Sequence, residues 1–123
     1  MGHSPTALVV EDHAGVLALA VAVLENAGWR VLQAESAEAA VAVLEETAVD
    51  VIVSDVSMPG GTTGQVPTYP ADRRGVRPGV VYMSGDTARA QVRRQPGTEQ
   101  AHFLTKPFAP SALIEAVAAV SSG

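Results

Sequence analysis

The sequence has 123 residues, 47% of them apolar, with a formal net charge of -5, one Trp and no Cys. A chain of this length buries roughly two thirds of its unfolded surface, so we expect one globular domain without covalent cross-links. The acidic balance argues against direct nucleic-acid binding, and the lack of Cys excludes disulfides and thiol chemistry. The longest apolar run, Val16–Leu24, is shorter than the roughly 20 residues that cross a bilayer. We therefore predict a cytoplasmic protein without direct membrane contact.

The amino-terminal part of the chain alternates between strand and helix patterns. Met1-Gly2-His3-Ser4 is typical of an expression scar, so we assign the domain to residues 5–123. The apolar run Ala7–Val10 ends at Glu11 and Asp12, which predicts a strand buried on both faces. The following elements are predicted to be a helix at Ala14–Ala27 closed by Gly28, a strand at Trp29–Ala34, and a helix at Ala37–Thr47 capped by Ser36.

Three further strands and a closing helix are predicted in the rest of the chain. The strands are Val49–Ser54, which leads to Asp55, Val80–Met83, which leads to Ser84, and His102–Thr105, which leads to Lys106. The final helix, Ser111–Val120, is expected to turn Leu113, Ile114, Val117 and Val120 inward. Five strands joined by crossovers predict a doubly wound α/β fold, a parallel sheet with helices on both faces.

Two crossovers have weak helical patterns. The segment from Pro59 to Pro78 contains Pro67, Pro70 and several Gly residues, so we expect its helix, the third, to be short or broken. The segment Asp86–Gln95 allows about two helical turns before Pro96.

Polar side chains follow the strands at what should be one edge of the sheet, where open parallel sheets bind ligands. Three carboxylates, from Glu11, Asp12 and Asp55, repel one another unless a cation lies among them, and an oxygen-rich site suits Mg²⁺. With the Ser84 hydroxyl and Lys106, the chain's single lysine, such a site could position and neutralise a transferring phosphoryl group. Asp55 is the predicted nucleophile because it stands alone after an apolar strand.

Each of these residues also has a simpler interpretation. Asp12 alone is more often a helix N-cap than a metal ligand, and Lys106 alone is an ordinary loop lysine. Ser84-Gly85-Asp86 alone is an ordinary turn. His13 is interpreted as a helix-start residue. The joint occurrence of these groups at the ends of four strands favours the functional interpretation.

The pattern resembles the receiver domain of two-component response regulators over nearly the whole chain. The matching stretches are Leu8–Asp12, Asp55–Pro59, Met83–Gly85 and Phe103–Phe108. The resemblance implies a flavodoxin-like strand order 2-1-3-4-5 and phosphorylation of Asp55 by a histidine kinase or a histidine phosphotransfer domain. The stretch Met58–Gly64 is similar to receivers fused to hybrid sensor kinases.

The resemblance also implies a role for individual residues. Mg²⁺ would be held by Glu11, Asp12, Asp55 and the carbonyl of Ser57, and the phosphoryl group by Ser84 and Lys106. Ser84 and Phe103 would form the switch that alters a partner-binding surface, and the Lys106–Pro107 bond would be cis, which is chemically accessible before proline. Ser57 and Asp86 lie where the family tunes the lifetime of the phosphoryl group.

In this phosphorelay role the chain would catalyse only its own phosphorylation and dephosphorylation. Two alternatives to this role remain open. One is a phosphatase of the haloacid-dehalogenase type, although that family has a second acid two residues after its nucleophile, where this chain has Ser57. The other is an interaction module of the same fold that is never phosphorylated. Turnover of a phosphate ester would indicate the first, and indifference to Mg²⁺ the second.

Overall fold

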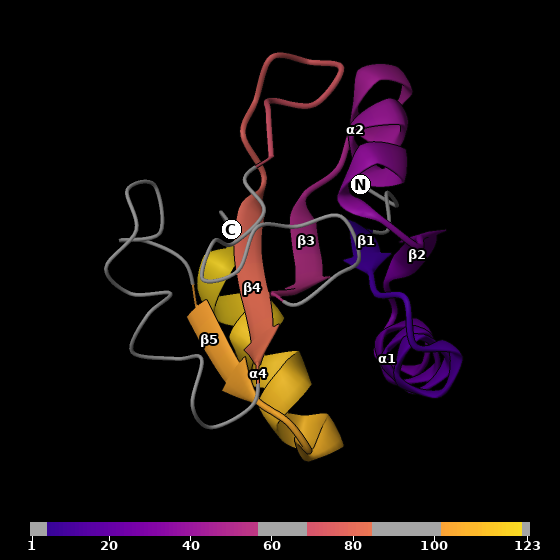
Figure 1. Ribbon diagram of the computed structural model, residues 1–123. Helices are drawn as coiled ribbons and strands as arrows, with labels where there is room; N and C mark the ends of the chain where they lie inside the picture. The colour runs from indigo at the N-terminus through magenta and orange to yellow at the C-terminus, as the bar shows by residue number, and fades with distance from the viewer. Residues whose placement is uncertain (1–4, 57–68, 85–101, 122–123) are drawn as a thin grey trace.

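The computed structural model describes residues 5–56, 69–84 and 102–121, with Ser84 described only in its backbone (Figure 1). Its sheet has five parallel strands in the order β2-β1-β3-β4-β5, which confirms the predicted doubly wound topology. In chain order the strands are β1 (Thr6–Val10), β2 (Arg30–Ala34), β3 (Val51–Asp55), β4 (Gly79–Ser84) and β5 (His102–Thr105). The switch in strand order between β1 and β3 creates the edge at which such folds bind ligands.

In the described part of the chain three helices cover the sheet: α1 (Ala14–Asn26), α2 (Ala37–Glu46) and α4 (Pro110–Val120). The Ser36 hydroxyl caps α2 by accepting a hydrogen bond from the Ala39 N–H at 3.0 Å, as predicted. After α1, Gly28 adopts the expected left-handed conformation, with φ of 99°. None of the helices in the described part of the chain is long and apolar enough to cross a membrane.

The two faces of the sheet bury separate apolar clusters. On one face α1 and α4 pack over alternate strand residues, among them Val9, Val53 and Met83. On the other face α2 and Tyr69 pack over the intervening residues, among them Leu8 and Ile52. Because β3 is buried on both sides, its side chains at successive positions belong to opposite faces.

Some predicted boundaries and orientations were wrong. β3 begins at Val51, because the Val49 N–H donates to the Asp72 carboxylate at 2.9 Å and not to a neighbouring strand. β2 begins at Arg30, because the Trp29 N–H instead closes the end of α1 by donating to the Leu24 carbonyl. Ile114 was expected to be inward, but it is 38% exposed on α4.

The connection that leads to β4 contains no helix in its described part, residues 69–78, in agreement with the predicted break. It forms the red loop at the top of Figure 1. Its buried Asp72 carboxylate accepts hydrogen bonds from the backbone N–H groups of Val49, Arg74 and Val76 and from the Arg74 guanidinium. Residues 57–68 and 85–101, which include the predicted helical turns of Asp86–Gln95, lie outside the described residues, as do 1–4.

Candidate functional site

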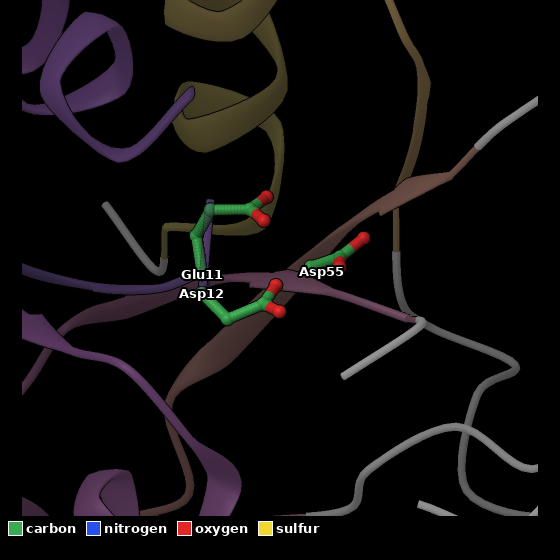
Figure 2. Close-up of side chains that lie close together, drawn as sticks. All are labelled: Glu11, Asp12 and Asp55. Atoms are coloured by element: carbon green, nitrogen blue, oxygen red, sulfur yellow. The ribbon is translucent and has the colours of Figure 1, made fainter. Parts of the chain in front are cut away.

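Three acidic side chains converge where β1 and β3 end, as Figure 2 shows. Glu11 and Asp12 follow β1 directly, and Asp55 is the last residue of β3. One carboxylate oxygen from each lies within 4.8 Å of the other two. Glu11 and Asp55 are buried, 1% and 6% exposed, whereas Asp12 is exposed to solvent. The structure therefore brings together the three carboxylates that the sequence predicted.

Backbone contacts hold Glu11 in place. The Glu11 N–H donates to the Ala34 carbonyl at 3.0 Å, which extends the pairing of β1 with β2 by one residue. The Glu11 carboxylate also accepts a hydrogen bond from the His13 N–H at 3.2 Å. His13 is the N-cap of α1, and its Nδ1 accepts from the Val16 N–H. The simpler interpretation of Asp12 as the helix cap is therefore wrong, and the helix-start role expected for His13 is confirmed.

Lys106 lies between the two buried carboxylates. Its Nζ donates to Glu11 Oε1 at 2.8 Å and to Asp55 Oδ1 at 3.1 Å. Partial burial alone would lower the pKa of Lys106, but the hydrogen bonds to Glu11 and Asp55 outweigh it, so the pKa is raised and the ammonium stays charged. The Lys106–Pro107 bond is cis, as predicted.

The two residues that the resemblance assigns to a switch, Ser84 and Phe103, are described in part. Phe103 lies on β5, half-buried, and stacks on Tyr82 of β4 with ring centroids 5.9 Å apart and planes 24° apart. The backbone of Ser84 pairs with that of Thr105 at the end of β4, while its hydroxyl lies outside the described atoms. Ser57 and Asp86 also lie outside the described residues.

The charge balance of the site indicates which kind of ligand would fit it. Among the described residues, three carboxylates face a single ammonium, so this cluster carries excess negative charge in a partly buried setting. An all-oxygen donor set with one solvent-exposed member suits Mg²⁺, which keeps several waters and takes one or two carboxylates. A bound cation of this kind would reduce the repulsion and leave Asp55 next to two positive charges.

A pair of buried hydroxyls beside the site was missed in the sequence. The Ser54 and Tyr69 hydroxyl oxygens are 2.7 Å apart, and Ser54 Oγ donates to the carbonyl of Asp55 at 2.9 Å. The two residues are 15 positions apart, and Tyr69 lies in a stretch rich in Pro and Gly. Local patterns carry no signal for such a contact.

Comparison with known proteins agrees with the fold. Residues 7–118 match the model of the response regulator receiver domain, and the chain belongs to this family. It is therefore a receiver domain of two-component signalling.

Individual relatives are similar over most of the chain. The sensor kinase CckA of Brucella abortus is 35% identical over 85% of the chain, and the phosphate regulon transcriptional regulatory protein PhoB of Escherichia coli is 34% identical over 92%. The chain spans 11% and 50% of these two relatives. A response regulator receiver protein from Sinorhizobium medicae has a solved structure that matches with a TM-score of 0.77 and 27% identity, covering 96% of this chain and 94% of that one.

Proposed function

We propose that the chain is a phosphoacceptor in which Asp55 receives a phosphoryl group from the phosphohistidine of a histidine kinase or a histidine phosphotransfer domain. A carboxylate oxygen of Asp55 attacks phosphorus, the phosphorus–nitrogen bond breaks, and the histidine leaves with its electron pair. The observation that carries the proposal is the Lys106 ammonium, held 3.1 Å from Asp55 Oδ1 beside two further carboxylates. Membership of the receiver family supports it.

The residues around Asp55 have separate tasks in this reaction. Lys106 neutralises charge that develops on the phosphoryl oxygens, and it is restrained by its contact with Glu11. Glu11, Asp12, Asp55 and the Ser57 carbonyl would hold Mg²⁺, which would shield the negative charge of donor and acceptor from each other. The Ser84 hydroxyl contacts the phosphoryl group, and Ser57 and Asp86 tune how long it lasts.

The output of the proposed reaction is a local change at β4 and β5. When the Ser84 hydroxyl turns towards the phosphoryl group, Phe103 moves into the space it leaves and alters a partner-binding surface. Phe103 is half-buried and stacked on Tyr82, so this movement would exchange one packing for another. The similarity to part of a protein named a sensor kinase supports a histidine kinase as the phosphodonor.

Intact mass spectrometry tests the proposal directly. The chain is incubated with acetyl phosphate and Mg²⁺ beside three comparisons: Asp55→Asn, a sample with chelator, and Asp50→Asn. Asp50 lies just before β3, at the opposite end from Asp55, and is the matched control. We expect one phosphoryl adduct on the wild-type chain and on Asp50→Asn, and none on Asp55→Asn or with chelator.

Other outcomes would select one of the alternatives. No adduct, together with failure to form a beryllofluoride complex, would favour an interaction module that is never phosphorylated. Steady release of phosphate from an external ester would favour a haloacid-dehalogenase-type phosphatase. An adduct that persists in Asp55→Asn would show that the nucleophile is a different residue.

A further inference from the structure

Tyr69 reaches the end of β3 from the connection that precedes β4. Its hydroxyl is 2.7 Å from Ser54 Oγ, and both residues are buried. Ser54 has a single hydroxyl proton, which it donates to the Asp55 carbonyl at 2.9 Å. The Tyr69 hydroxyl is therefore the donor to Ser54, and the two bonds form a directed chain from Tyr69 to the backbone of Asp55.

These two hydrogen bonds act on the peptide group between Asp55 and Val56. The carbonyl of that group, from Asp55, accepts from Ser54, and its N–H, from Val56, donates to the Met83 carbonyl at 3.1 Å. Both polar groups of the peptide are thus bonded. The peptide orientation determines the direction in which the Asp55 side chain leaves the backbone, towards Glu11 and Lys106.

Tyr69 is itself firmly held. Its ring packs in the apolar cluster beneath α2, and its carbonyl accepts from the Arg77 guanidinium at 3.4 Å. Three residues further on, Asp72 binds the Val49 N–H just before the start of β3. Burial raises the pKa of Tyr69 well above the ordinary value for tyrosine, despite the opposing hydrogen bond with Ser54, so the hydroxyl keeps its proton and remains a donor.

We propose that Tyr69 is a positioning residue for phosphoryl transfer, which holds the Asp55 carboxylate in its attacking orientation through the Ser54 hydroxyl. The inference rests on the proposed function of Asp55. Loss of the Tyr69 hydroxyl removes one neutral hydrogen bond, so we expect the maximal phosphorylation rate to fall roughly 3- to 10-fold. The donor concentration that gives half the maximal rate should not change, because Tyr69 makes its contact behind Asp55.

A double-mutant cycle tests whether Tyr69 acts through Ser54. Tyr69→Phe keeps the ring in the cluster and removes only the hydroxyl, while Ser54→Ala removes the intermediate group. Phosphorylation by acetyl phosphate is followed by intact mass over a range of donor concentrations for the wild-type chain, both single variants and the double variant. We expect each single variant to lose rate, and Tyr69→Phe to cause no further loss in the Ser54→Ala background.

Several results would overturn the inference. Additive losses in the cycle would show that the Tyr69 hydroxyl acts independently of Ser54. An unchanged maximal rate in both single variants would show that the two linked hydroxyls have no effect. If Tyr69→Phe unfolds at the assay temperature, Ser54→Ala alone tests the inference. Its maximal phosphorylation rate must then fall by the amount expected for Tyr69→Phe.

The failure of this inference can be distinguished from failure of the proposed function. A wild-type chain without an adduct overturns both, whereas an adduct on the wild-type chain with an additive cycle overturns only the role of Tyr69. The NMR chemical shift of the Val56 amide gives a second measure that needs no phosphorylation. It should move in Tyr69→Phe, and Tyr69→Phe should add no shift when Ser54 is already alanine.

Discussion

Replacing Lys106 with methionine removes the ammonium between Glu11 and Asp55 and keeps most of the side-chain volume. Both carboxylates are buried, and one oxygen of Asp12 lies within 4.8 Å of an oxygen of each, so the variant leaves three acidic groups together without the ammonium that binds Glu11 and Asp55. We expect Lys106→Met to be less stable than the wild-type chain when no divalent cation is present.

The contact distances give the size of this effect. At 2.8 and 3.1 Å, each ion pair has a gross attraction of about 5–6 kcal/mol for an effective dielectric constant near 20. Much of this attraction is offset by desolvation, and breaking a buried pair costs about 3–5 kcal/mol. The Lys106 side chain is 26% exposed, so water screens the pair and the lower end applies. A loss of about 3 kcal/mol lowers the melting temperature by roughly 10 °C at this chain length.

Thermal unfolding followed by circular dichroism measures the difference, with chelator and with Mg²⁺. The pKa of Lys106 is raised on folding, so its contribution to the free energy of unfolding is complete below the unfolded pKa and is lost only as pH rises through the folded pKa. The difference in melting temperature between Lys106→Met and the wild-type chain should therefore be constant from pH 7 to about pH 9. Mg²⁺ should restore part of the lost stability. Arg73→Met, which removes an exposed cation elsewhere, is the control. An unchanged melting temperature of Lys106→Met in chelator would refute the reasoning.

The remaining predictions concern stability away from the site. Burial would raise the pKa of Asp72, but the hydrogen bonds of its carboxylate to Arg74 and to the backbone lower the pKa overall. The contribution of Asp72 to the free energy of unfolding is therefore present above the unfolded pKa near 4 and is lost as pH falls further. Denaturant titrations should show wild-type stability falling below pH 4 more steeply than that of Asp72→Asn, and equal slopes would contradict this. Gly79→Ala should destabilise by about 1–3 kcal/mol, because the added Cβ would overlap the backbone of Val120. Melting beside Gly15→Ala, whose Cβ would meet only the His13 side chain, checks it.

The sequence predicts those features of the fold that depend on short-range patterns. Apolar runs locate all five strands of the sheet within two residues. Single residues after and before helices locate Gly28 as a left-handed residue and Ser36 as a cap. Because parallel strands share one carboxyl edge, the convergence of the acidic residues and Lys106 also follows from the strand assignments alone.

The features that were missed depend on contacts between distant positions. Nothing near Asp72 in the sequence indicates that its carboxylate binds the Val49 N–H, 23 positions away, and so shortens β3. The exposure of Ile114 has the same origin, since the helical period marks an apolar face without showing how far the neighbouring α1 and the sheet cover it. Pattern reasoning identifies which residues can be buried, and tertiary packing determines which are.

The central place of β3 separates two timescales in this molecule. All five residues of the strand are buried, and β3 pairs with β1 on one side and with β4 on the other. Its amide protons should therefore exchange with solvent only when the whole domain opens. Asp55 is the last residue of this strand, so the proposed phosphorylation would add and remove a group while the backbone that carries it remains protected. Exchange of β3 amides should remain as slow as global unfolding through repeated cycles of modification.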